Sequence, residues 1–362
     1  MNHIRRVQEA LAGEGLDAVL LTGEANRFYA MGYYTPNGDA IGLVSKNAAW
    51  FFTDARYTEA AGRSLEGTEL LELTPEKPFS AYIQTLAKEH SIRRLGFEDA
   101  SMSVQAFQRL EGHLDKLESP CETVPASGWL GKLRQSKDQE ELAALEAAQR
   151  IAERALSDIL NEIKPGVTEK EIAARLQYLM LHHGASDMSF DPIVVSGPNG
   201  SLPHGVPSEK QIQAGEFVTM DFGCIYQGYC SDMTRTVAVG YATSEMWQVY
   251  QTVLDAQFAG IAAARTGVTG KSVDAAAREV ITAAGFGPYF THSFGHGVGV
   301  EIHEAPNLSS RSEEPLPAGA VVSAEPGIYV PGKLGVRIED VIVLTEDGCT
   351  NLTRAPKELI IL

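Results

Sequence analysis

The chain has 362 residues, of which 44% are hydrophobic and 21% charged, as in an ordinary globular protein with room for two domains. Its formal net charge of −17 at pH 7 argues against nucleic acid or an anionic membrane as a partner. No run of about 18 apolar residues exists, so we expect no membrane span.

The first 127 residues predict an α/β domain, because strand-like apolar runs alternate with helix-like stretches. The predicted strands are Ala18–Leu21, Ala40–Val44 and Ala49–Thr53. The predicted helices are Ile4–Gly13 and Phe79–His90. We therefore divide the chain into an N-terminal domain, residues 1–127, and a second domain, residues 128–362.

The second domain begins with a long predicted helix, Gln139–Ile163. The pattern Ser136-x-x-Gln139 indicates a capping box at its start, and apolar residues follow at helical spacing. Pro165 and Gly166 then end the helix.

An internal repeat follows in this domain. The segment Gly166–Lys170 recurs 101 residues later as Gly267–Lys271, and each copy enters a helix, Ile172–His183 or Val273–Ala284. Each copy is preceded by a longer helix, Gln139–Ile163 or Glu245–Arg265, and followed by a strand-rich stretch. Although the copies share few identities, two related halves would give a curved antiparallel sheet backed by four helices, an α+β domain with a pseudo-two-fold axis.

Two aspartates lie at the ends of neighbouring predicted strands. Asp221 closes the apolar run Phe217–Gly223, and Asp232 opens the β-branched run Asp232–Val239. The link Cys224–Ser231 contains Gly228 and can form a hairpin. Both carboxylates can then point at one place.

Three further ligand-type residues lie in structured contexts. His296 is surrounded by three glycines, which permit close backbone approach and unusual dihedral angles. Glu325 directly precedes a Pro-Gly turn. Glu339 lies in the strand-like run Gly335–Val343, two residues after Arg337, so both side chains face the same side.

Four carboxylates and one imidazole around one cavity would be costly unless cations lie among them. A single Asp at a strand end is usually a turn residue, but five such residues in five structured contexts predict a site for two divalent ions. Oxygen ligands with one His favour Mn²⁺, Co²⁺ or Fe²⁺ over structural zinc. The chain has no His-Glu-x-x-His motif, and its Asp-Phe-Gly lacks the other kinase motifs.

The stretches 221–236, 292–304 and 323–340 resemble the pita-bread metallopeptidases, in the branch of aminopeptidase P and prolidase. The spacings match: 11 residues from Asp221 to Asp232, 7 from His296 to His303, and 14 from Glu325 to Glu339. The resemblance covers the whole chain, and residues 1–127 resemble the creatinase-like accessory domain of this branch. Methionine aminopeptidases usually lack that domain, and creatinase lacks the ligand set.

The resemblance implies a role for each site residue. Asp221 would bind one ion, His296 and Glu325 the other, and Asp232 and Glu339 would bridge two ions, which we expect to be Mn²⁺, with Co²⁺ or Zn²⁺ as alternatives. Glu325 would also move the proton of the attacking water. Of the remaining predicted site residues, His204 and His303 would be catalytic groups at the carbonyl oxygen. His292 and Arg337 would be binding groups, Arg337 by orienting either the substrate or a carboxylate ligand.

The implied substrates are peptides with proline at the second position, and the family implies a homodimer. Some prolidases place an arginine four residues after the position of His303, where this chain has Asn307. That difference favours longer peptides over dipeptides. Two alternatives stay open: a hydrolase acting on another C–N bond, such as that of a cyclic amidine, and an inactive binding protein of the same fold.

The four cysteines, Cys121, Cys224, Cys230 and Cys349, show no Cys-x-x-Cys spacing. We interpret them as reduced thiols, with a Cys224–Cys230 disulfide as the less favoured alternative. Because no apolar signal core follows the basic residues of the N-terminus, we expect a cytoplasmic protein.

Overall fold

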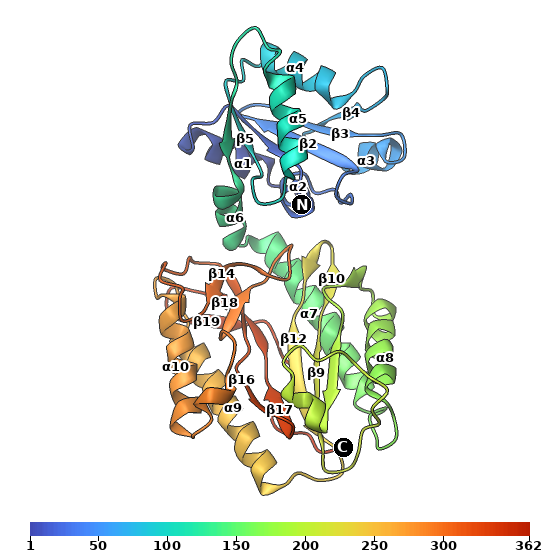
Figure 1. Cartoon of the computed structure of the whole chain (residues 1–362), viewed down its shortest axis with the longest axis vertical. Coiled ribbons are helices and arrows are strands. Elements are labelled where there is room, and N and C mark those ends of the chain that lie inside the picture. Colours follow the sequence, from blue (N-terminus) through green and yellow to red (C-terminus); the bar gives the residue numbers. More distant parts are fainter. The chain divides into compact units, whose positions relative to one another are not determined.

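The computed structural model describes all 362 residues, which form two compact units, Met1–Arg134 and Gln135–Leu362 (Figure 1). Each unit contains two hydrophobic clusters of its own. None of the helices combines the length and the apolar character that crossing a membrane requires.

The first unit is a six-stranded mixed sheet with helices on both faces. The strand order is β4-β3-β2-β1-β5-β6. Its strands are β1 (Ala18–Leu21), β2 (Ala40–Ser45), β3 (Ala49–Thr53), β4 (Glu69–Glu72), β5 (Arg94–Phe97) and β6 (Glu122–Pro125). Its helices are α1 (Ile4–Gly13), α2 (Glu24–Met31), α3 (Thr58–Ser64), α4 (Phe79–Glu89), α5 (Val104–Leu114) and α6 (Ser127–Gln135).

Alternation along the strands builds the two cores of this unit. Val19 and Phe51 pack in the cluster that contains α1, whereas Leu20 and Phe52 pack in the cluster that contains α4 and α5. The α/β prediction for this region is confirmed.

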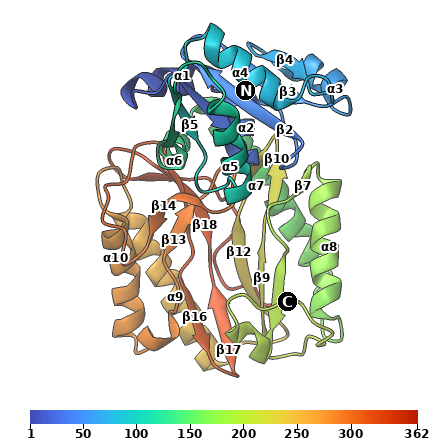
Figure 2. The same ribbon diagram turned by 45° about the horizontal axis from the view of Figure 1, so that its top comes forward.

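The second unit consists of two halves, each with two helices packed on antiparallel strands (Figure 2). The first half contains α7 (Gln139–Ile159), α8 (Glu169–His182), β8 (Ile193–Ser196), β9 (Phe217–Phe222) and β12 (Met233–Ala238). The second half contains α9 (Ser244–Ala263), α10 (Gly270–Ala283), β15 (Val321–Ala324), β16 (Gly327–Val330), β17 (Leu334–Arg337) and β18 (Asp340–Leu344). This arrangement agrees with the two related halves that the repeat predicts.

Shorter elements complete the second unit. They are β7 (Asp187–Met188), η1 (Gly197–Ser201), β10 (Cys224–Tyr226), β11 (Tyr229–Cys230), η2 (Gly287–Tyr289), β13 (Gly295–Gly297), β14 (Glu304–Leu308) and β19 (Cys349–Asn351).

The predicted hairpin between the two aspartates is confirmed. Strands β9 and β12 pair antiparallel with Asp221 opposite Thr234, and β10 and β11 extend the ribbon. The turn between β10 and β11 has positive φ at both central residues, 48° at Gln227 and 80° at Gly228, as a type I′ hairpin requires. All four cysteines of the chain are free thiols, so the alternative disulfide across this hairpin is not formed.

The predicted capping box of α7 is wrong by two residues. The N-cap is Asp138, whose side chain accepts from the backbone N–H of Glu141 at 3.0 Å. Glu141 in turn accepts from the N–H of Asp138 at 2.9 Å. Ser136 instead forms an isolated bridge with Ala320. A long-range backbone contact therefore overrides the local Ser-x-x-Gln pattern.

The same helix ends at Ile159, four residues before the predicted end at Ile163. The side-chain amide of Asn161 donates to the carbonyls of Ser157 and Asp158 at 3.1 and 3.4 Å. Those bonds satisfy carbonyls of the last turn, where a helix has no further N–H of its own to offer.

The strand predicted over Gly335–Val343 is interrupted at Ile338 and Glu339. Strand β17 pairs with β16, whereas β18 pairs with β15. At the break, the N–H of Glu339 donates to the carbonyl of Thr234 at 3.1 Å. The backbone thus changes sheets at the position of a predicted ligand.

Candidate active site

One cavity of about 500 Å³ in the second unit is lined by every residue that the sequence analysis assigns to the site. These residues are His204, Asp221, Asp232, His292, His296, His303, Glu325, Arg337 and Glu339. The structure therefore brings together side chains from both halves of the unit.

The two aspartates reach the cavity from the hairpin. Asp221 lies near the end of β9, and Asp232 directly precedes β12. Asp232 is 4% exposed, and the side chain of Gln149 on α7 holds its backbone carbonyl at 3.2 Å. The helix behind the sheet thus fixes the place where this carboxylate leaves the backbone.

The glycines around His296 are needed for space. A Cβ on Gly295 would lie 2.0 Å from the carbonyl oxygen of Ser323, and one on Gly297 would lie 2.6 Å from that of Glu304. Neither glycine has positive φ, so the expected close approach is confirmed without unusual dihedral angles at these positions.

The ring of His296 is oriented by both of its nitrogens. Nδ1 lies 3.1 Å from the carbonyl oxygen of Gly297, and Nε2 lies 3.2 Å from Oε1 of Glu325 and 3.5 Å from Oδ2 of Asp232. A proton on Nδ1 donates to the carbonyl, which leaves Nε2 to face the carboxylates.

The carboxylates and the imidazole fit a metal centre. Asp232, His296 and Glu339 can each offer a ligand atom, and these atoms all lie within 4.8 Å of one another. Oδ1 of Asp221 and Oε1 of Glu339 are buried without a hydrogen-bond partner. Because an unpaired buried carboxylate oxygen is costly, coordination of a cation would satisfy both atoms. The oxygen-rich donor set with one imidazole suits a hard divalent ion.

The pKa values indicate strong repulsion among these carboxylates. Burial, followed by the neighbouring carboxylates Glu339, Asp221 and Glu325, raises the pKa of Asp232 well above its usual range. Burial, Glu325 and Asp221 do the same to the pKa of Glu339. Burial also raises the pKa of Asp221, although Arg337 opposes the shift.

Glu325 and His296 stabilise each other as an ion pair. Burial alone would raise the pKa of Glu325, but the hydrogen bond and charge of His296 outweigh it and lower that pKa to about 2. Burial would lower the pKa of His296, but Glu325 outweighs it and raises that pKa to about 9. The hydroxyl of Ser323 also donates to Oε1 of Glu325 at 3.0 Å.

His204 and His303 lie on loops at the cavity. His204 is exposed and follows η1, and His303 directly precedes β14. The rings of His303 and His296 have centroids 4.4 Å apart and planes at 70°. Burial, followed by the charge of His296, lowers the pKa of His303, which favours its neutral form.

Comparison with known proteins identifies the family of this chain. Residues 143–346 match metallopeptidase family M24, and residues 3–136 match the creatinase/prolidase N-terminal domain. The first match alone covers more than half of the chain. The chain belongs to metallopeptidase family M24.

Similar M24 proteins cover nearly the whole chain. A Xaa-Pro dipeptidase from Pyrococcus furiosus is 45% identical over 345 residues, which is 95% of each chain. The structure of a Xaa-Pro dipeptidase from Bacillus anthracis is 43% identical, with a TM-score of 0.92 and 99% coverage of both chains. An X-Pro aminopeptidase from Thermotoga maritima is 35% identical, with a TM-score of 0.92 and 100% coverage of both chains.

This M24 protein also has two site residues that the sequence analysis missed. The hydroxyl of Thr234 donates to Oε2 of Glu339 at 2.7 Å. The hydroxyl of Tyr329 contacts both Arg337, at 2.7 Å, and His292, at 2.9 Å.

A signal for Tyr329 was present in the sequence. Pro331 and Gly332 mark a turn, and a hairpin across it pairs Tyr329 with Gly335. Tyr329 is then diagonal to Arg337, within reach of its side chain.

Proposed function

We propose that this M24 protein uses two divalent cations to hydrolyse the bond between an N-terminal residue and a proline at the second position. The proposal rests on one observation above all: four carboxylates, buried or nearly so, and an imidazole face a single cavity that three further histidines also line. The similar proteins named as Xaa-Pro dipeptidase and X-Pro aminopeptidase support the substrate class.

Five residues would hold the cations. Asp232 and Glu339 would bridge them, in keeping with their short distances to His296. His296 and Glu325, whose facing atoms are 3.2 Å apart, would complete one site, and Asp221 the other. We propose Mn²⁺ as the native ion, with Co²⁺ or Zn²⁺ as alternatives.

When bound, the cations supply Lewis-acid chemistry that lets water attack a peptide carbonyl near neutral pH. Glu325 would accept the proton of the attacking water and pass it to the proline nitrogen as the C–N bond breaks. Ser323 holds the Glu325 carboxylate in place for both transfers.

His303 and His204 would stabilise the carbonyl oxygen as it gains negative charge. A neutral imidazole can donate an N–H to that oxygen, and the lowered pKa of His303 favours this form. His292 would bind the substrate backbone on the side of the cavity next to Tyr329. Arg337, which is bonded to Asp221 and Tyr329, would act in binding by orienting the Asp221 carboxylate.

The remaining lining residues suit a proline ring. Four of them present apolar surface, and they are Phe190, Ile193, Pro203 and Ile302. A proline nitrogen in a peptide bond carries no hydrogen, so the site need not offer an acceptor for it.

We also propose that peptides longer than two residues are preferred. Arg337 is the one arginine among the lining residues, and no lysine lines the cavity. Its guanidinium is already bonded to Asp221, Tyr329, Thr234 and the carbonyl of Pro203. The cavity therefore has no Arg or Lys side chain that is free to form an ion pair with the carboxylate of a C-terminal proline.

A homodimer remains a prediction from the family. The same holds for the division of roles between an accessory domain of residues 1–127 and a catalytic domain of residues 128–362.

The activity is tested with two tripeptides. Mn²⁺-loaded protein should release the first residue of Ala-Pro-Ala at least 10-fold faster than that of Ala-Ala-Ala, since ring recognition in an apolar pocket is worth roughly 10–200-fold. Equal rates would mean a broad aminopeptidase, and no release from either tripeptide or from the dipeptide Ala-Pro would refute the proposal.

The ligand assignment is tested with Glu339→Ala. Removal of one bridging carboxylate should abolish turnover and lower the bound Mn²⁺ measured by elemental analysis, because the two dications would repel each other more strongly. Glu346→Ala, at an exposed position after β18, is the control and should behave as wild type. Glu339→Ala protein that keeps two tightly bound ions would contradict the assignment.

A further inference from the structure

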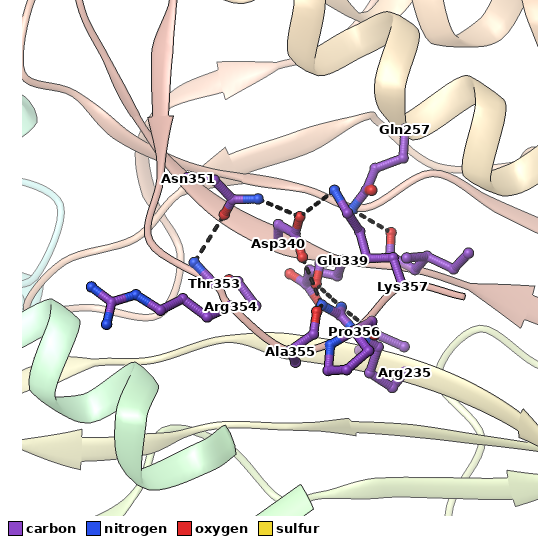
Figure 3. A network of polar contacts seen from close by, with 12 residues as sticks. Arg235, Gln257, Glu339, Asp340, Asn351, Thr353, Arg354, Ala355, Pro356 and Lys357 are labelled. Carbon is purple, nitrogen blue, oxygen red and sulfur yellow. Dashed lines mark hydrogen bonds and ion pairs between the residues drawn. The ribbon is translucent and has the colours of Figure 1, made fainter. Parts of the chain in front are cut away.

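A buried polar network lies behind Glu339, outside the cavity (Figure 3). Its centre is an ion pair between Arg235 of β12 and Asp340 of β18, with Nη2 and Oδ1 2.8 Å apart. Arg235 is 3% exposed and Asp340 is 0% exposed. Neither residue lines the cavity, so neither can touch a substrate there.

The Arg235 guanidinium binds carbonyl groups of two distant segments. Nη1 donates to the carbonyl of Glu339, the residue that carries the candidate ligand. Nε donates to the carbonyl of Pro356 and Nη2 to that of Ala355, both at 2.8 Å. Arg235 thus connects the backbone of Glu339 to the segment Asn351–Lys357, named here the C-terminal strap.

The strap also holds the other oxygen of Asp340. Oδ2 accepts from Nδ2 of Asn351 at 2.6 Å and from Nζ of Lys357 at 2.8 Å. The ammonium of Lys357 also lies 4.6 Å from the ring centroid of Phe258. Two positively charged side chains, Arg235 and Lys357, and the amide of Asn351 therefore hold the Asp340 carboxylate in place, and Figure 3 shows these groups converging on Asp340.

Glu339 lies between two strands and outside the pairing of either, and its one backbone tie is the bond from its N–H to the carbonyl of Thr234 at 3.1 Å. Side chains hold the groups around it. The carbonyl of the preceding residue, Ile338, accepts from Gln257 at 3.3 Å. The Glu339 carbonyl accepts from Arg235, and its carboxylate accepts from Thr234. Rotation of the peptide group on either side of Glu339 would move the Glu339 carboxylate within the cavity.

Stability alone is a weak reason for such a network. Burying an ion pair costs desolvation that the mutual attraction often only balances, and apolar side chains of similar size can be as stable. In contrast, substitution of residues that hydrogen-bond to metal ligands changes the affinity of the site for the metal.

We propose that Arg235, Asp340 and Lys357 are positioning residues through which the C-terminal strap sets the Glu339 carboxylate for metal binding. This inference rests on the proposed function, because it takes Glu339 as a ligand. It assigns a role in metal binding to a segment that contributes no residue to the cavity.

The test compares the full-length chain with Asp340→Asn, Lys357→Met and Arg354→Met. Arg354 is the matched control: it also lies on the strap, but its side chain is 68% exposed and pairs with Glu146. Mn²⁺ dissociation constants come from calorimetric titration. Thermal midpoints of the metal-free proteins report on folding independently.

We expect Asp340→Asn to weaken Mn²⁺ binding by about 10–100-fold, and Lys357→Met to weaken it near the lower end of that range. Arg354→Met should bind as wild type does. If Asp340→Asn fails to fold, Lys357→Met decides, because the Arg235–Asp340 pair remains in that variant.

Two results would overturn the inference. Variants with a lowered midpoint in the metal-free form but unchanged Mn²⁺ affinity would show that the network only stabilises the fold, and the proposed function would stand. Wild-type protein that bound no Mn²⁺, Co²⁺ or Zn²⁺ would refute the proposed function and this inference together.

Discussion

The guanidinium of Arg337 donates from Nη1 to the hydroxyl oxygen of Tyr329 at 2.7 Å. That oxygen lies 2.9 Å from Nε2 of His292, to which it can donate its own proton. Burial raises the pKa of Tyr329 to about 12 and lowers the pKa of His292. Both groups therefore stay neutral near pH 7, and His292 carries its proton on Nδ1, 2.8 Å from the carbonyl oxygen of Ser293.

Tyr329→Phe should break the series of hydrogen bonds from Arg337 through Tyr329 to His292 without replacing a proposed metal ligand. Arg337 would lose an acceptor and His292 a donor, and a lost bond to a charged group costs about 1.5–3 kcal/mol. We expect the free energy of unfolding in urea to fall by about that amount, and the KM for Ala-Pro-Ala to rise while the Mn²⁺ content stays unchanged.

The control for this variant is Tyr241→Phe, at a side chain that is 59% exposed. It should match wild type in both measurements. Tyr329→Phe protein with unaltered stability and KM would show that the hydroxyl contacts have no energetic weight.

His303→Ala separates the chemistry from metal binding. His303 is proposed as a donor to the carbonyl oxygen and not as a ligand, so bound Mn²⁺ should be unchanged. Loss of one such donor lowers kcat by a factor on the order of 10²–10³. His182→Ala, at an exposed position on α8, serves as the control. Loss of bound metal in His303→Ala, or an unchanged kcat, contradicts the assigned role.

Metal binding should release protons at pH 7. The pKa of Asp232 and of Glu339 is raised, primarily by burial, and that of His296 is raised to about 9 by Glu325. In metal-free protein His296 therefore holds a proton at pH 7 that a cation must displace, and the raised pKa values of Asp232 and Glu339 favour their protonated forms, whereas ligands bind in their deprotonated forms. The apparent Mn²⁺ affinity should therefore increase as the pH rises from about 6 to about 9.

Calorimetric titration in two buffers with different ionisation enthalpies measures these protons directly. The observed heat of Mn²⁺ binding should differ between the buffers by the number of protons released multiplied by the difference between the two ionisation enthalpies. Identical heats in both buffers would show that the ligands are already deprotonated before the metal binds.

The proposed ligands could be found from the sequence because each lies in an informative local pattern. Asp221 closes an apolar run and Asp232 opens a β-branched run, and a turn that contains a glycine connects the two. His296 stands among glycines that the crowded backbone requires. Such a pattern involves only residues that are close together in the sequence, so it can be recognised without knowledge of the fold.

Other features depend on partners far along the chain. The run Gly335–Val343 has the composition of a single strand, and its interruption depends on Thr234 and Gln257. The network at Asp340 likewise joins β12 to the strap, so neither segment alone indicates it. Hydrogen bonds between such distant residues leave no periodic signal in a single sequence.

The final prediction concerns the residue after the proline. Since the arginine of the cavity is fully engaged, a neutral group after proline should be preferred to a carboxylate, and kcat/KM should be higher for Ala-Pro-NH₂ than for Ala-Pro. Asn307 lines the cavity and is exposed, so Asn307→Arg would add an unengaged guanidinium that can pair with a carboxylate. That variant should shift the ratio of the two rates toward Ala-Pro by at least 10-fold, or about 1.4 kcal/mol. Asn307→Gln keeps the position neutral and should leave the ratio unchanged. A wild-type enzyme that prefers Ala-Pro, with a ratio insensitive to Asn307→Arg, would mean that another group binds the carboxylate, and the preference for longer peptides would have to be given up.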